Sequence, residues 1–290
     1  MSKEKRTMSK FNKRDGNVLV KIVIYTVCIF FAILSLWPFI IMLVNSTRSS
    51  GAIQSHAVSF IPSTYLSYNW HVFDGKTFNV FVGLKNSAII SIGTTICTIY
   101  FSTLTAYGIV AYRWKFRKAF FAFILAIMMI PTIVISIGTY QFMYQIHLVN
   151  NLAALIIPTI AAPSAVFFMR QFLVSSFPLE LLDSARIDGS GEFRTFNQIA
   201  LPIMKPAMAT QGIFTFVSSW NSLFLPSILL TKKTLYTLPV MVSQLKGDIY
   251  KVEYGTVYLG LTLTVLPLFV IYFALSKYII AGVALGSVKG

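Results

Sequence analysis

Residues 22–44 read IVIYTVCIFFAILSLWPFIIMLV, a stretch of 23 residues that contains no Asp, Glu, Lys or Arg. A helix needs about 20 mostly apolar residues to cross the hydrocarbon core of a bilayer, so this stretch predicts a membrane-spanning helix. It is longer than the apolar region of about 7–15 residues that is typical of a cleaved signal peptide. We therefore expect it to be retained as a first span.

Five further stretches without an acidic or basic residue follow along the chain. They comprise residues 87–112, 119–146, 152–169, 207–230 and 255–276. β-Barrel strands are about 10 residues long and alternate with a period of two, whereas these runs are longer and uniformly apolar. Only 11% of the 290 residues are charged, against roughly 25% in an average soluble domain. The sequence predicts an all-α polytopic membrane protein with six transmembrane helices.

The distribution of basic residues predicts the orientation of these helices. Six spans place both termini on one side, and the loops on that side hold 17 of the 24 Lys and Arg residues. Basic loops remain in the cytoplasm, so both termini are expected there. The net charge of +15 is then mainly a signal of topology. Nucleic-acid binding is disfavoured.

The spans contain nothing that would drive transport or catalysis. They hold no acidic, basic or histidine side chain, which disfavours an ion-coupled carrier and an intramembrane metalloprotease. No GxxxxGK[ST] phosphate-binding loop occurs in the chain. Cys28 and Cys97 lie in apolar stretches and read as small core residues. We expect no catalytic residue, no metal site and no cofactor in this chain, so energy for uphill transport would come from a separate subunit.

Neutral polar and aromatic side chains are found in the third and fifth spans. Aromatic faces together with amides and hydroxyls can hold a sugar. The same groups also form hydrogen bonds between helices and aromatic belts at the membrane interface. As a set they indicate that a neutral polar substrate is compatible with the pathway. The candidate pathway residues are Tyr140, Gln141, Tyr144, Ser218, Ser219, Trp220 and Asn221.

The loop between the fourth and fifth spans has the pattern of a folded helical hairpin. Residues 175–206 read SSFPLELLDSARIDGSGEFRTFNQIALPIMKP. Ser176 is expected to cap a first helix, Gly189 and Gly191 to end it, and Pro202 to stop a second. The second helix would carry an apolar stripe of Phe193, Phe196 and Ala200. Such a hairpin could dock into a partner or lie on lipid.

This loop resembles the EAA loop of ABC importer permeases, which reads Glu-Ala-Ala, three residues, Gly, nine residues and Ile-x-Leu-Pro. Here Asp183-Ser184-Ala185 stands at the first position, Gly189 at the glycine, and Ile199-Ala200-Leu201-Pro202 at the end. Asp183 and Ser184 depart from the pattern, and the shorter Asp side chain changes the reach of the charge. Residues Trp220-Asn221, Pro226, Tyr236–Pro239 and Gly286–Gly290 are similar to the carbohydrate-uptake branch. Within that branch the chain most resembles the smaller permease subunit of maltose-type importers.

The resemblance implies a permease in the bacterial plasma membrane that imports di- or oligosaccharides and works with several partners. These are a second homologous permease subunit, two cytoplasmic ATPase subunits that bind ATP and Mg, and an extracytoplasmic solute-binding protein. Residues Asp183, Ser184, Ala185, Arg186, Asp188 and Gly189 would form the helix that couples to the ATPases. Gly286, Val288, Lys289 and Gly290 would lie at the ATPase interface.

The implied domain plan divides the chain as follows: basic segment 1–21, first helix 22–44, extracytoplasmic loop 45–86, core permease domain 83–276 with coupling loop 175–203, and cytoplasmic tail 277–290. Two alternatives remain at this stage. The cargo could be a polyol, glycerol phosphate or a peptide, or the chain could be a stand-alone channel or membrane enzyme.

Overall fold

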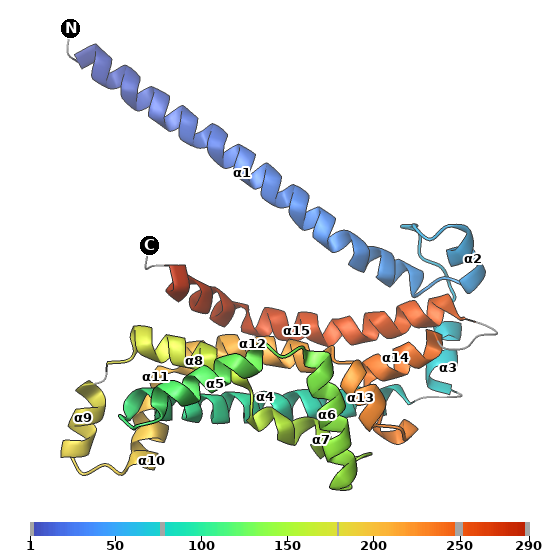
Figure 1. Ribbon diagram of the computed structural model, residues 1–290. Coiled ribbons are helices and arrows are strands. Elements are labelled where there is room, and N and C mark those ends of the chain that lie inside the picture. Colours follow the sequence, from blue (N-terminus) through green and yellow to red (C-terminus); the bar gives the residue numbers. More distant parts are fainter. Residues whose placement is uncertain (1–2, 76–78, 179, 247–251, 288–290) are drawn as a thin grey trace. The chain divides into compact units, whose positions relative to one another are not determined.

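The computed structural model describes residues 3–75, 79–178, 180–246 and 252–287, with helices throughout and no strand in these ranges. This confirms the all-α class. The chain divides into two compact units, Met1–Trp70 with Glu253–Thr262, and His71–Val252 with Leu263–Gly290. Two helices, α3 (Leu66–Gly75) and α15 (Tyr254–Ser287), contribute residues to both units (Figure 1).

The first unit begins with α1 (Lys3–Asn45) and contains the short α2 (Ser50–Ser55). None of the apolar window of α1 is buried within the chain, as expected for a helix that meets lipid or another subunit. Just beyond α1, the buried guanidinium of Arg48 donates hydrogen bonds to Asn45 Oδ1 and to the carbonyls of Ala52 and His56. Arg48 therefore joins the end of α1 to the backbone at the end of α2.

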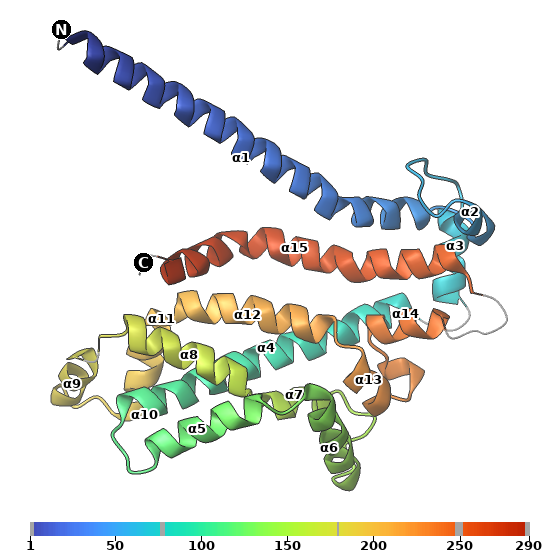
Figure 2. The same ribbon diagram turned by 45° about the horizontal axis from the view of Figure 1, so that its top comes forward.

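The second unit is built around α4 (Val80–Ala111), a helix of 32 residues. It packs against α8 (Pro163–Ser176) and α12 (Lys205–Trp220), which both views show beside it (Figures 1 and 2). Several hydroxyls of α4 donate to the carbonyl four residues earlier, as Thr95 does to Ser91 and Thr103 to Ile99. This internal bonding lets a hydroxyl-rich helix lie in an apolar medium.

Short helices complete the second unit. They are α5 (Arg117–Met128), α6 (Thr132–Gln145), α7 (Ala153–Ile156), η1 (Ile157–Ile160), α9 (Glu180–Ile187), α10 (Glu192–Thr195), the π-helical turn η2 (Phe196–Ala200), α11 (Leu201–Ile203), α13 (Phe224–Leu229), η3 (Lys233–Leu235) and α14 (Leu238–Lys246). The α9–α10 hairpin lies at the Ala111 end of α4, and α6 and α13 lie toward its other half (Figure 2).

The predicted count of six spanning helices is not confirmed in the described part of the chain. Four helical stretches are long and apolar enough to cross a membrane: 20–45, 80–111, 153–176 and 254–273. A fifth is counted if α5 and α6, which are bent by 99°, form one span. The predicted span 207–230 is divided into α12 and α13, and neither half has the length of a crossing.

The third predicted span is interrupted by a proline. Pro131 precedes α6, and its carbonyl accepts from the amides of Val134 and Ile135. Because proline has no amide hydrogen and restricts the residue before it, α5 ends at Met128 rather than continuing to residue 146. The stretch 119–146, expected as one span, is therefore divided at Pro131 into α5 and α6, which are bent by 99°.

Candidate functional site

Two features of the second unit are candidates for function: the α9–α10 hairpin and an uncharged cavity among the membrane helices. The hairpin begins with α9, whose charges suit the helix dipole. Glu180 and Asp183 lie in the first turn and Arg186 in the last, and each sign is favourable at that end. Leu182 and Ala185 are buried, so one side of this short helix packs inward.

Gly189 ends α9 in the left-handed conformation, with φ of +74°. The amide of Ser190 donates to the Ala185 carbonyl at 2.9 Å, and the amide of Gly189 donates to the Arg186 carbonyl at 3.0 Å. This pair of bonds is the Schellman motif, which favours glycine at this position. The predicted break at Gly189 is confirmed and has a defined backbone cause.

Ser176 and Pro202 have other roles than those expected. Ser176 is the last residue of α8 and not the cap of α9. Pro202 lies in the first turn of α11, and the helical path continues from Glu192 to Ile203 through the π-helical turn. Proline has no amide hydrogen, but in the first turn of a helix that hydrogen would have no helical partner. The wider π-helical turn precedes α11 and lets the helical path continue through Pro202.

The hairpin is fixed to the membrane helices by an apolar core. Leu182 of α9 and Phe196 and Ala200 of η2 are buried in the same cluster as Tyr107 of α4 and Met169 of α8. The expected stripe is divided, since Phe196 and Ala200 face this core whereas Phe193 is 70% exposed. The hairpin therefore packs as a folded extension of the helix bundle.

A polar network crosses the same junction. The Tyr112 hydroxyl, just beyond α4, donates to Glu192 Oε2 at 2.6 Å, and Arg186 Nε donates to Glu192 Oε1 at 2.9 Å. Arg186 also pairs with Asp183 at 3.4 Å, and its guanidinium lies 5.5 Å from the centre of the Tyr112 ring. The hydrogen bonds from Tyr112 and then Arg186 lower the pKa of Glu192. Burial and then the Glu192 hydrogen bond raise the pKa of Tyr112.

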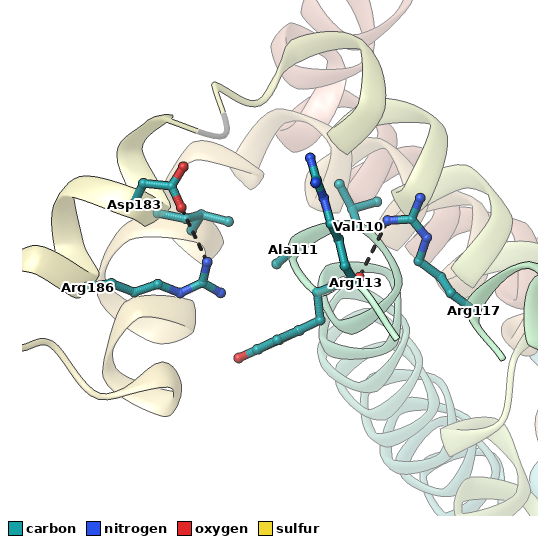
Figure 3. Close-up of a pocket in the computed structure, with 8 residues that line it drawn as sticks. Val110, Ala111, Arg113, Arg117, Asp183 and Arg186 are labelled. Carbon is teal, nitrogen blue, oxygen red and sulfur yellow. Dashed lines mark hydrogen bonds and ion pairs between the residues drawn. The ribbon is translucent and has the colours of Figure 1, made fainter. Parts of the chain in front are cut away.

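A cavity of about 680 Å³ separates α9 from the end of α4 and the start of α5 (Figure 3). Asp183 and Arg186 line it from one side, and Arg113 and Arg117 from the other (Figure 3). Arg117 Nη1 makes a long bond of 3.4 Å to the Tyr112 carbonyl. The cavity thus presents three guanidinium groups and one carboxylate.

The outer side of the hairpin exposes apolar side chains. Ile187 is 86% exposed, and Phe193 and Leu181 are also exposed. Of the other predicted coupling residues, Ser184 donates to the Glu180 carbonyl, Ala185 is buried, and Asp188 is exposed. Large apolar residues on a polar hairpin form a surface suited to a protein partner.

The second feature is a cavity of about 530 Å³ among α4, α6, α8, α12 and α13. Its lining is mainly apolar but includes several hydroxyls and the Gln211 amide, and no charged side chain is found among the described residues that line it. Thr94 faces it with only 7% of its surface exposed, and its Oγ1 has no hydrogen-bond partner. The polar lining residues are Thr94, Thr98, Thr132, Ser136, Thr139, Thr159, Ser164, Gln211, Thr215, Ser218, Ser219 and Ser222.

Only two of the predicted pathway residues, Ser218 and Ser219, line this cavity. Tyr140 and Tyr144 stack on each other along α6, with ring centres 6.4 Å apart, and Gln141 lies between them in sequence. Trp220 is buried, and its Nε1 donates to the Thr264 carbonyl at 2.9 Å; Asn221 ends α12. The sequence signal missed for the cavity is the recurrence of hydroxyls at 91, 94, 98 and 102, which marks one side of α4.

Other predictions concern the tail and metal binding. Val288, Lys289 and Gly290 lie outside the described residues, and Gly286 belongs to the last turn of α15. The described residues contain no group of three or more His, Cys, Asp or Glu side chains that could hold a metal ion.

Comparison with known proteins identifies the family. Residues 98–284 match the family "Binding-protein-dependent transport system inner membrane component". The chain is 34% identical to the arabinooligosaccharides transport system permease protein AraQ of Bacillus subtilis, over 90% of this chain and 94% of that protein. It is also 34% identical to the lactose transport system permease protein LacG of Rhizobium radiobacter, over 93% and 97%.

The fold is also found in a solved structure, that of a bacterial ABC transporter involved in the import of the acidic polysaccharide alginate. The TM-score is 0.75 at 20% identity, over 91% of this chain and 97% of that one. With the family match and the two relatives, the resemblance of the chain to ABC importer permeases is confirmed, and the chain belongs to the inner-membrane permease family of binding-protein-dependent ABC transport systems.

Proposed function

We propose that this chain is one of two permease subunits of an ATP-driven importer of di- or oligosaccharides in a bacterial plasma membrane. The observation that carries the proposal is the attachment of the hairpin: its inner side is packed into the helix bundle, whereas Ile187 and Phe193 on its outer side are exposed. A surface of this kind can pass the movement of a docked ATPase to the membrane helices as a lever.

In this proposal, two cytoplasmic ATPases bind ATP and Mg, and a solute-binding protein delivers cargo from outside. Asp183, Ser184, Ala185, Arg186, Asp188 and Gly189 form the coupling segment, as the resemblance of 183–202 implies. Asp183 already pairs with Arg186 of its own helix at 3.4 Å, so its charge is shared within the chain. The tail through Gly286 to Gly290 would add a second contact with the ATPases.

The proposed topology has six crossings with both termini in the cytoplasm. The bent pair α5–α6 supplies one crossing, and α12 with α13 supplies another, each from a stretch without charge in the sequence. The excess of basic residues in the loops on the terminal side supports this orientation. The domain plan follows from it, with loop 45–86 outside and the coupling loop 175–203 inside.

The neutral cavity supports a sugar rather than an anion as cargo. Its lining offers hydroxyl and amide groups from several helices and no cation among the described residues. Sugar hydroxyls both donate and accept hydrogen bonds, as these side chains do. Glycerol phosphate would require a compensating charge, because a buried anion is costly without one. The names of the two relatives, which refer to arabinooligosaccharides and lactose, agree with this choice.

Reconstitution of the chain with co-purifying subunits tests the proposal. The chain should bring a second permease and an ATPase, and the proteoliposomes should accumulate labelled arabino-oligosaccharide, lactose or maltose only with ATP and a binding protein. Uptake of glycerol 3-phosphate in place of the sugars would refute the cargo assignment. Passage of solute through the purified chain alone would refute the importer in favour of a channel.

A further inference from the structure

The cavity between α9 and the end of α4 is lined by two arginines whose positive charge is not neutralised by an acidic side chain among the described residues. Both ion pairs found in the described ranges use Arg186, with Asp183 and with Glu192. Arg113 and Arg117 have no acidic partner there, although both line the cavity (Figure 3). Two guanidinium groups that line one cavity can form a site for an anion, and arginine suits phosphate oxygens because it binds them in a bidentate manner.

The position of the two arginines indicates where the anion comes from. Residues 112–116 are the short connection between the apolar helices α4 and α5, so Arg113 and Arg117 lie where two membrane helices end. Trp114 and Phe116 alternate with the basic residues and are both exposed. Exposed aromatic rings among cations are typical of segments at the level of lipid headgroups.

We propose that Arg113 and Arg117, with Arg186 on the facing wall, bind the phosphate of an anionic phospholipid at the cytoplasmic end of α4. The headgroup would join the end of α4, the start of α5 and the coupling helix α9 through one ligand. Trp114 and Phe116 would lie against the acyl chains beside it. This inference requires a bilayer around the chain and does not depend on the cargo or on ATP coupling.

The experiment uses the full-length chain in nanodiscs of phosphatidylcholine mixed with phosphatidylglycerol, and native mass spectrometry counts the lipids that it retains. The wild-type chain should retain phosphatidylglycerol in preference to phosphatidylcholine. R113Q/R117Q should reduce that preference by about tenfold or more, because each charge-assisted hydrogen bond to a phosphate is worth about one decimal order or more. R113K/R117K, which keeps the charge, should retain part of the preference.

A matched control removes the same charge from the same connection. Lys115 and Lys118 do not line the cavity between α9 and α4, although they share a neighbouring hollow with Arg113 and Arg117, so K115Q/K118Q should lower the preference several-fold less than R113Q/R117Q does. An equal loss in both double variants would show diffuse attraction and overturn the site. Displacement of the lipid by inorganic phosphate, at an ionic strength matched with chloride, would make it a general anion site and overturn the lipid assignment; retention in phosphate supports it.

Discussion

The hydroxyl of Tyr112, at the end of α4, donates a 2.6 Å hydrogen bond to the carboxylate of Glu192, the first residue of α10. Eighty residues separate the two in sequence. Arg186 of α9 binds the other oxygen of the same carboxylate at 2.9 Å. Glu192 thus joins α4 to both helices of the α9–α10 hairpin.

Tyr112→Phe should loosen the hairpin without unfolding the bundle. The variant loses the bond to Glu192 and keeps the ring, and such a bond at an exposed site stabilises by about 1 kcal/mol. Hydrogen exchange of the amides of residues 180–195 should accelerate about fivefold, since 1.4 kcal/mol corresponds to a factor of ten. Tyr100→Phe is the matched control, because its hydroxyl makes only a 3.5 Å contact with Asn197. Equal acceleration in both variants would contradict the role of the Tyr112–Glu192 hydrogen bond in holding the hairpin.

The same network predicts how hairpin stability depends on pH. The lowered pKa of Glu192 means that its contribution is present above the unfolded-state pKa and is lost as the pH falls through the lower folded value. The raised pKa of Tyr112 means that its contribution is complete below the unfolded pKa of about 10 and is lost as the pH rises further. Exchange protection of the hairpin should therefore be greatest between about pH 5 and pH 9. Tyr112→Phe should weaken the alkaline limb, and an unchanged limb would argue against the assignment.

Gly189 gives a prediction about coupling. Its φ of +74° is costly for residues with a Cβ, although no atom lies within 4 Å of the place that a Cβ would occupy. Gly189→Val should therefore strain the backbone by about 1–2 kcal/mol and lower sugar uptake per ATP hydrolysed, while the chain still inserts in the membrane. Gly189→Asn is the control, because asparagine tolerates the left-handed region and should keep most of the uptake. Full uptake by the valine variant would show that this turn is unimportant for coupling.

Gly255, at the start of α15, gives a prediction about the first unit. A Cβ at this position would collide with the Arg48 carbonyl and with the side-chain amide of Asn69. That amide donates to the carbonyls of Ser46 and Arg48, so Gly255→Ala would disturb both bonds and should destabilise by about 1–3 kcal/mol. Thermal unfolding in detergent measures the effect. Gly51→Ala, with open space around its Cβ, should leave the unfolding temperature unchanged or slightly higher.

Some of the structure could be predicted from local sequence. Apolar length predicted where most long helices lie, because membrane helices need about 20 residues whatever their packing. The break at Gly189 was predictable because the left-handed turn depends on a single residue. The family was predictable because the 183–202 pattern consists of particular residues at fixed spacing, together with the similar residues at 220–239 and 286–290.

Other features depend on contacts between distant segments. The sequence contains no pattern that predicts the hydrogen bond between Tyr112 and Glu192, because this bond forms only after α10 folds against the end of α4. Phe193 and Phe196 both fit an apolar stripe, but only Phe196 reaches the core formed with Tyr107 of α4 and Met169 of α8, whereas Phe193 is exposed. Trp220 was expected in the pathway, whereas packing against α15 lets its indole donate to Thr264.

The most direct test of the account asks what touches Ile187. A cysteine at position 187, in a chain whose Cys28 and Cys97 have been replaced by alanine, would carry a photoactivated cross-linker in the assembled membrane complex. The account predicts a cross-link to the nucleotide-hydrolysing subunit, with none from a cysteine at the exposed Phe123 of α5. Cross-linking of position 187 to phospholipid alone would contradict the coupling role of the hairpin.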